Sequence, residues 1–276
     1  MNSEPGKANA GLLGVFNSIA ASYERRGPRF FSHFGERLVE RMRIASNAHV
    51  LDVATGRGAV LFPAAACVGE RGQITGVDFS SAMISETAAE VDGLKIRNIE
   101  LRQMDAGNLE FPDSTFDYVL CGLSLWFFPN PQQALQEFFR VLKPGGRAGL
   151  TTFHKDSPIQ QVYVPALRRH LPPAKDAGTV SPPRFDTAEQ LDSALRQAGF
   201  NGMQIEAEER DFVYASEDEL WEVVLAGGYK RFVDQMSDSA RENAKADLYE
   251  HLQPLKRADG VHAAYRVWFA SGIKAQ

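Results

Sequence analysis

Cysteine is scarce in this sequence, with two residues among 276, Cys67 and Cys121. Neither has a second ligand at the spacing of a metal site, and two cysteines are too few for a disulfide framework. The sequence therefore predicts no metal site, and the sparse cysteines favour a reducing compartment.

The chain also lacks an apolar run of the roughly 20 residues that a membrane-spanning helix needs. Its longest uncharged segment, 118–136, is apolar only as far as Phe128. Near the N-terminus, Glu4 stands where a secretory signal carries positive charge, and polar residues interrupt the apolar run at 12–21. We therefore expect a cytoplasmic protein with no membrane span.

An excess of positive charge is absent as well, because 30 Lys and Arg residues face 35 Asp and Glu residues, for a net charge of −5. This balance argues against a dedicated nucleic-acid-binding protein. A local basic cluster is interleaved with Glu24, Glu36 and Glu40, which favours a solvated helix face over a track for phosphates. Its members are Arg25, Arg26, Arg29, Arg37, Arg41 and Arg43.

The composition that remains is that of a globular protein, with 44% hydrophobic and 24% charged residues. This length allows one large domain or two small ones, since a single core stops growing at about 250 to 300 residues. We favour one domain that carries a cap.

Short apolar runs alternate with amphipathic stretches in the first half of the chain, which is typical of a doubly wound α/β sheet. The run at 49–54 is nearly continuous, as expected for a strand buried on both faces. Two helices at 10–21 and 33–44 precede it. Further strands are predicted at 74–78, 99–104, 116–122 and 147–153, and helices at 59–68, 81–91 and 131–142.

Capping residues mark several helix ends. Asn130 is expected to cap the helix that Pro131 opens, and the segment 143–146, Lys-Pro-Gly-Gly, to end it. Capping boxes predict helix starts at Thr187 and Ser216.

Prolines make 155–186 a predicted loop-rich insertion, and strands at 203–209 and 264–270 enclose a mostly helical segment at about 216–258. The predicted divisions are N-terminal helices at 1–45, a nucleoside-binding core at 46–154, the insertion at 155–186, and the end of the sheet with its helical cap at 187–276.

A turn built of small residues follows the first strand. In the segment 52–58, Asp-Val-Ala-Thr-Gly-Arg-Gly, backbone can approach a ligand without side chains intervening. Asp78 closes the second strand, where a carboxylate can accept hydrogen bonds from both hydroxyls of a ribose. Together these features predict a nucleoside ligand.

Phosphate-binding motifs do not accompany this turn. The sequence has no Gly-Lys-Ser or Gly-Lys-Thr, which argues against nucleoside triphosphates. The spacing also differs from the Gly-x-Gly-x-x-Gly of dinucleotide sites, and Asp52 would repel a pyrophosphate. An acid at this position suits a cationic amino group, which S-adenosylmethionine supplies.

Five segments carry a resemblance to a known family: 52–58, 77–80, 104–106, 116–119 and 142–146. In these segments the chain resembles the class I S-adenosylmethionine-dependent methyltransferases, in particular the small-molecule branch of the ubiquinone and menaquinone C-methyltransferases. The resemblance covers about 16–153. It implies a Rossmann-like sheet of seven strands with the last strand antiparallel, N-terminal lid helices, and a helical cap inserted between the last strands.

The resemblance also implies the cofactor contacts. The turn would hold the methionine part and Asp78 the ribose, whereas Asp105 and the amide of Ala106 would contact the adenine. Tyr23 matches a lid position, and Ala54 stands where many members have glycine, a replacement that the branch tolerates. The predicted cofactor-binding residues are Tyr23, Asp52, Ala54, Gly56, Gly58, Asp78, Phe79, Met83, Met104, Asp105, Ala106, Gly122 and Leu123.

Two further family segments are assigned structural roles. Asp117 is interpreted as a strand partner, and the segment 144–146 as a helix stop.

The acceptor is predicted to be small and largely apolar, on a quinone-like, prenylated or natural-product scaffold, with methylation of carbon or oxygen favoured. Trp126 follows the fourth strand, where the acceptor should lie. The aromatic residues of the later segments are interpreted chiefly as core of the cap. They are Tyr163, Phe212, Tyr214, Trp221, Tyr229 and Phe232.

No catalytic residue is assigned, because the donor methyl is already activated and catalysis can rest on orientation and exclusion of water. His154 is a hypothetical base, although a surface loop histidine is the simpler interpretation. Two other functions stay open: methylation of nucleic acid or protein, and nucleoside binding without catalysis.

Overall fold

The computed structural model describes residues 5–171 and 185–276, which cluster into two compact units. Among the described residues, the sheet unit comprises 30–154, 185–208 and 267–276, and the helical unit comprises 5–29, 155–171 and 209–266. Strands β6 and β8 each contribute residues to both units.

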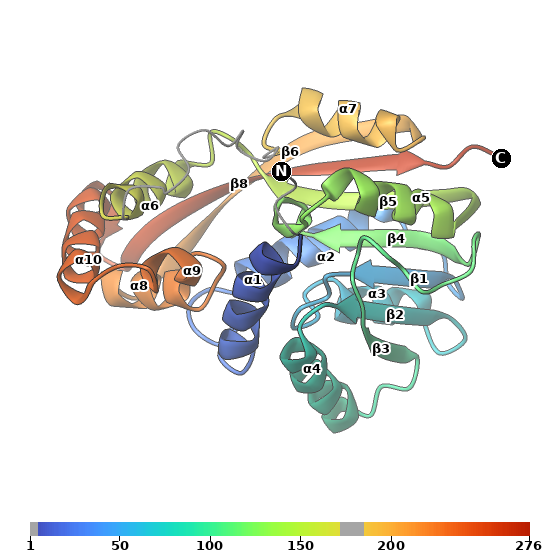
Figure 1. Ribbon diagram of the computed structural model, residues 1–276, viewed down its shortest axis with the longest axis horizontal. Coiled ribbons are helices and arrows are strands. Elements are labelled where there is room, and N and C mark those ends of the chain that lie inside the picture. The colour runs from blue at the N-terminus through green and yellow to red at the C-terminus, as the bar shows by residue number, and fades with distance from the viewer. Residues whose placement is uncertain (1–4, 172–184) are drawn as a thin grey trace. The chain divides into compact units, whose positions relative to one another are not determined.

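Within the described residues, seven strands follow the order β3-β2-β1-β4-β5-β8-β6, and the short strand β7 pairs with β8 (Figure 1). Strands β1 to β5 pair in parallel, whereas β8 is antiparallel to β5. This topology confirms the predicted doubly wound sheet. The strands are β1 (His49–Val53), β2 (Gln73–Asp78), β3 (Ile99–Gln103), β4 (Phe116–Gly122), β5 (Leu142–Phe153), β6 (Asn201–Tyr214), β7 (Lys256–Arg257) and β8 (Gly260–Ile273).

Two groups of helices cover opposite faces of the sheet unit. Met42 of α2 lies beside Gly149, whereas the next residue, Leu150, belongs to a core cluster with Phe138 of α5 and Leu191 of α7. Successive residues of a strand point to opposite faces, so α2 lies on one face and α5 with α7 on the other. The helices of this unit are α2 (Phe30–Met42), α3 (Leu61–Val68), α4 (Ser81–Leu94), the short η1 (Leu125–Phe127), α5 (Pro131–Val141) and α7 (Ala188–Gln197).

The predicted caps are confirmed. The side chains of Asn130, Thr187 and Ser216 accept hydrogen bonds from the third amide of α5, α7 and α8, and Pro131 occupies the first turn of α5. Each cap satisfies an amide that the helix itself leaves unbonded.

The helical unit holds α8, α9 and α10 between β6 and β8 in the chain, as predicted for the inserted cap. Its aromatic side chains contact one another: the rings of Tyr163 and Tyr229 lie 4.9 Å apart, and the hydroxyls of Tyr214 and Tyr265 lie 2.7 Å apart. With Trp221 also buried, this confirms a core role for Tyr163, Tyr214 and Trp221, whereas Phe212, Tyr229 and Phe232 are half-buried. The helices are α1 (Pro5–Ile19), α6 (Pro158–Arg169), α8 (Glu217–Leu225), α9 (Lys230–Val233), α10 (Asp238–Leu252) and η2 (Gln253–Leu255).

The prediction of a loop-rich segment at 155–186 is wrong for its first half, which forms α6. Pro158 occupies the first turn, where its missing amide costs nothing. Ile159, Tyr163 and Ala166 are buried at helical spacing, so the apolar period overrides the proline signal. The prolines at 172, 173, 182 and 183 lie outside the described residues.

Strand β5 begins at Leu142, five residues before the predicted start at Arg147. The segment 143–146, predicted as a helix stop, forms an irregularity in which the pairing with β4 shifts register. It is held by Lys274, whose amide donates to the Gly146 carbonyl and whose carbonyl accepts from the Gly145 amide. Pairing with a distant strand therefore extends β5 beyond its apolar run.

Among residues 5–171 and 185–276, no helix has the length and apolarity to cross a membrane, and no three His, Cys, Asp or Glu side chains converge as they would around a metal ion.

Gly35 brings α2 against the residues that open α3. A Cβ at this position would lie 2.2 Å from the carbonyl oxygen of Ala59, which is next to the turn at 52–58. Gly93 in α4 has nothing within 4 Å of the same position.

We therefore expect Gly35→Ala and Gly93→Ala to change stability in opposite directions. Alanine at Gly93 should stabilise by about 0.5–1 kcal/mol, the usual gain inside a helix. At Gly35 the clash with backbone should outweigh this gain and destabilise by about 1–3 kcal/mol. Urea unfolding of both variants measures the difference. A stabilised Gly35→Ala would contradict the close approach of α2.

Candidate active site

The carboxyl ends of β1, β2 and β4 meet at one edge of the sheet unit. Asp52 of β1 is in register with Gly76 of β2 on one side and with Leu120 of β4 on the other. The strand order reverses between β1 and β4. Ligands of open α/β sheets bind at this switch point, outside the carboxyl ends of the strands.

Asp52 is buried at this edge, with 1% of its surface exposed. The hydroxyl of Thr55 donates to its Oδ2 at 2.6 Å. Burial raises the pKa of the carboxyl to about 7, because the charged form loses its hydration.

Asp78 is buried at the end of β2 and accepts two backbone hydrogen bonds. The amide of Gly56 donates to Oδ2 and the amide of Ser80 to Oδ1, both at 2.9 Å. Burial raises its pKa to about 6. The carboxylate thus ties the turn after β1 to the start of α4.

The turn adopts left-handed backbone at three predicted positions, with φ of 56° at Ala54, 51° at Gly56 and 83° at Gly58. A Cβ at Gly56 would meet nothing within 4 Å, so open space faces this residue. A Cβ at Gly58 would lie 2.5 Å from the ring of Phe62. Glycine is therefore required by packing at Gly58, whereas Gly56 leaves room for a ligand.

Two contacts that the sequence did not predict fasten this turn to α4. The hydroxyl of Thr87 donates to the Gly56 carbonyl at 2.7 Å. The buried guanidinium of Arg57 pairs with Glu90 at 3.0 Å and with Glu86 at 3.3 Å. The two acids are four residues apart and therefore share one face of α4. This spacing is the sequence signal that could have predicted an ion-pair site there.

The predicted adenine contacts lie near the end of β3. The Met104 amide donates to the Asp78 carbonyl at 2.9 Å, which joins this loop to the end of β2. Asp105 is exposed and its Oδ1 accepts from the Gly107 amide at 2.8 Å. Phe79 is half-buried, whereas Met83, Met104 and Ala106 are buried.

The chain leaves β4 through Gly122 and Leu123. The Leu123 amide donates to Thr151 of β5, at 2.9 Å to Oγ1 and at 3.1 Å to the carbonyl. Next to them, burial raises the pKa of the Cys121 thiol to about 12. This cysteine is therefore a neutral thiol and no nucleophile.

Aromatic rings gather beyond the ends of β4 and β5. Trp126 is half-buried, and its ring lies 5.2 Å from Phe153 and 5.3 Å from Phe127. Phe153 in turn lies 6.4 Å from Phe30, which lies 4.1 Å from Phe31. These five residues form a continuous aromatic row.

The interpretation of His154 as a surface loop residue is wrong, since it is 6% exposed and stacks on Trp268 at 4.6 Å. Trp268 is in register with Thr152, whereas the alternate residue Phe153 contacts Trp126. His154 therefore packs on the face of the sheet away from the aromatic row.

Tyr23 belongs to the helical unit, so its lid role stays a prediction.

The predicted solvated basic cluster is paired with acids: Arg37 and Arg41 share Glu208, at 3.0 and 2.7 Å, and Arg26 pairs with Glu222. Of the three interleaved acids, Glu40 pairs with Arg37.

A family model described as a methyltransferase domain matches residues 50–146, which include the turn, Asp78 and the β3–β4 segment. A solved structure of Haemonchus contortus phosphoethanolamine N-methyltransferase 2 in complex with S-adenosyl-L-methionine has a TM-score of 0.58 at 19% identity. It covers 96% of this chain and 57% of that chain, a likeness that shows the fold.

Three relatives are methyltransferases. Aklanonic acid methyltransferase of Streptomyces sp. (strain C5) is 38% identical over 166 residues, 57% of this chain and 76% of that protein. Nocamycin O-methyltransferase of Saccharothrix syringae is 28% identical over 270 residues, 94% and 96% of the two chains. A demethylmenaquinone methyltransferase of Listeria welshimeri is 35% identical over 137 residues, 48% and 58% of the two chains.

The match at 38% identity covers more than two thirds of its relative. The methyltransferase-domain match at 50–146 includes the strand ends where two buried acids flank an open backbone turn. On these grounds the chain belongs to the class I S-adenosylmethionine-dependent methyltransferases.

Proposed function

We propose that this enzyme transfers the methyl group of S-adenosylmethionine to oxygen or carbon of a small, largely apolar aromatic acceptor. The observation that carries the proposal is the pair of buried acids beside an open turn, Asp52 and Asp78, on the same sheet edge as the aromatic row. The relatives' names support it, because they are methyltransferases of natural products and of a quinone.

The cofactor-binding residues divide by chemistry. Asp52 suits the cationic amino group and Asp78 the ribose hydroxyls, which are donors to a carboxylate. Asp105 and the amide of Ala106 suit the adenine. The bound cofactor supplies a methyl group already activated on a sulfonium. Tyr23 is proposed as a lid contact, and Phe79 and Met83 as neighbours of the ring.

Trp126 is proposed as an acceptor contact, because its half-buried ring lies in the aromatic row, between Phe127 and Phe153, just after the end of β4. Flat aromatic acceptors bury apolar surface against such rings and can pack on them in the offset-stacked or edge-to-face arrangements that aromatic pairs prefer. The row would also exclude water from the methyl-transfer site.

Orientation is the proposed source of catalysis, and no catalytic base is assigned. His154 packs on the opposite face from Trp126, against Trp268. An acceptor whose oxygen is already ionised, such as a carboxylate or an acidic phenol, needs no base.

We expect Asp52→Asn to weaken S-adenosylmethionine binding by at least roughly thirtyfold, since truncating one partner of a buried charge pair costs about 2–5 kcal/mol. Titration calorimetry measures this loss. Asp192→Asn, which changes an exposed carboxylate paired with Arg196 on α7, is the control and should bind normally.

The same Asp52→Asn replacement should stabilise the ligand-free protein near pH 8. The folded pKa of about 7 lies above the ordinary 3.8, so ionisation of Asp52 costs folding free energy as the pH rises between these values. The gain should disappear below about pH 4, where the carboxyl is protonated in both states. Thermal unfolding across this range measures it, and a less stable variant at pH 8 would contradict the buried charge.

Binding of S-adenosylmethionine to the wild-type protein should weaken as the pH falls from about 7 to 5. Protonation of Asp52, with its pKa of about 7, and of Asp78, at about 6, removes the negative charge that the ligand needs. Calorimetry in two buffers of different ionisation enthalpy should show protons released on binding near pH 6. A dissociation constant unchanged over this range would refute the assignment.

The acceptor class is tested by offering labelled S-adenosylmethionine with phenols, quinones, aromatic acids, amines and total RNA. Label should enter an aromatic oxygen or carbon acceptor. Trp126→Ala should raise the acceptor KM at least roughly tenfold, the cost of losing one buried aromatic contact, and leave cofactor binding unchanged. Trp126→Phe should keep most of the affinity. Label in RNA or protein would overturn the proposed acceptor.

A further inference from the structure

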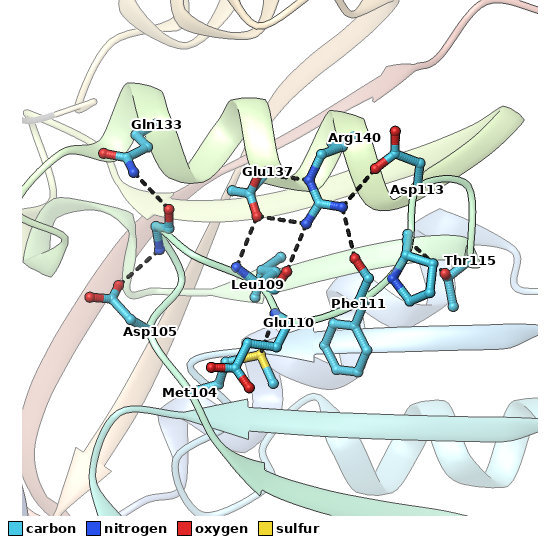
Figure 2. A network of polar contacts seen from close by, with 12 residues as sticks. Met104, Asp105, Leu109, Glu110, Phe111, Asp113, Thr115, Gln133, Glu137 and Arg140 are labelled. Carbon is cyan, nitrogen blue, oxygen red and sulfur yellow. Dashed lines mark hydrogen bonds and ion pairs between the residues drawn. The ribbon is translucent and has the colours of Figure 1, made fainter.

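Helix α5 presents a polar face to the loop at 104–115 that joins β3 to β4, hereafter the β3–β4 loop (Figure 2). Gln133, Glu137 and Arg140 are spaced by four and three residues, so their side chains share one face of the helix. Figure 2 shows all three directed at the loop.

The guanidinium of Arg140 uses each of its five N–H donors. Nη1 donates to the Phe111 carbonyl at 2.7 Å and to Oδ1 of Asp113 at 2.8 Å. Nη2 donates to the Leu109 carbonyl and to Oε2 of Glu137, both at 2.7 Å. Nε donates to Oε1 of Glu137 at 2.8 Å. Every donor of the guanidinium is therefore satisfied, and its orientation is fixed. We call Arg140 and these five acceptor atoms the Arg140 hub.

Glu137 and Gln133 extend the contact to the rest of the loop. Oε2 of Glu137 also accepts from the Leu109 amide at 2.9 Å, and Nε2 of Gln133 donates to the Gly107 carbonyl at 2.8 Å. The carbonyls of three alternate residues, 107, 109 and 111, thus all face α5. Hydrogen bonding to Arg140 holds the pKa of Glu137 below its ordinary value, so this acid stays ionised.

The loop also carries the residues proposed to read the adenine. Gly107, whose carbonyl is bound by Gln133, donates its amide to Asp105 at 2.8 Å. At its first residue the loop is joined to the end of β2, because the Met104 amide donates to the Asp78 carbonyl. The position of Asp105 is thereby set from two sides, by the end of β2 and by α5.

We propose that Arg140 is a positioning residue for recognition of the adenine ring. Through the β3–β4 loop it fixes Asp105 where the carboxylate can accept the exocyclic amino group, although Arg140 itself touches no part of the cofactor. The inference rests on the proposed adenine role of Asp105.

Replacement of Arg140 by lysine tests the hub specifically, because lysine keeps the charge but has only three donors, all on one atom. At least two of the five acceptors therefore lose their hydrogen bond from residue 140. Arg140→Lys should leave the sheet intact and loosen the loop. Glu137→Gln is a second variant, which keeps the helix and weakens the same hub through loss of its charge.

The test compares binding of S-adenosylhomocysteine with S-inosylhomocysteine, in which a carbonyl oxygen replaces the adenine amino group. The wild-type protein should prefer the adenine compound roughly tenfold or more, the effect of one hydrogen bond to a charged group. In Arg140→Lys the ratio of dissociation constants should fall to within about threefold of one. The KM for S-adenosylmethionine should rise roughly tenfold while kcat at saturation stays within about twofold.

Three comparisons separate the outcomes. Asp105→Ala should also erase the preference; if it does not, the adenine role of Asp105 fails and the inference with it. If Asp105→Ala erases it but Arg140→Lys does not, or if Arg140→Lys weakens both ligands equally, the inference about Arg140 alone is overturned. Arg196→Lys, at an exposed ion pair on α7, is the matched control and should keep the preference. Should Arg140→Lys not fold, the same ratios are measured on Glu137→Gln.

Discussion

Two carboxylates held out of water at the ends of β1 and β2 are the constraint that the rest of the site satisfies. Removing such charges from water costs several kcal/mol per ion. The Thr55 hydroxyl and the amides of Gly56 and Ser80 offset part of this cost by hydrogen bonding. The raised pKa values of Asp52 and Asp78 record the part that remains. A ligand with a cationic group and hydroxyl donors supplies what the protein alone does not.

The strands and the turn could be predicted because their determinants are local. The run at 49–54 is nearly continuous in apolar residues, Asp52 lies within it, and Gly56 and Gly58 follow within four residues. One short segment therefore specifies strand, turn and ligand class. Asn130, Thr187 and Ser216 cap their helices through amides three residues away. Interactions of that range are visible in the chain order alone.

The errors and omissions arise where distant segments decide. Strand β5 starts early because Lys274 pairs with Gly145 and Gly146, and α6 forms because its buried residues outweigh the prolines. His154 is buried against Trp268, more than a hundred residues later. Arg140 satisfies backbone carbonyls that lie 29 and 31 residues earlier in the chain. Every residue has a backbone carbonyl, whatever its side chain. No sequence motif therefore predicts which carbonyls Arg140 contacts.

Ala54 shows how a left-handed turn can carry a residue other than glycine. Left-handed backbone costs an alanine about 1–2 kcal/mol, whereas a glycine there would make the unfolded chain more flexible, at a penalty of about 0.4–1 kcal/mol. The two penalties act on different states of the protein and partly cancel. Alanine and glycine at this position should therefore differ in stability by less than the backbone cost alone, so the turn can accept either residue.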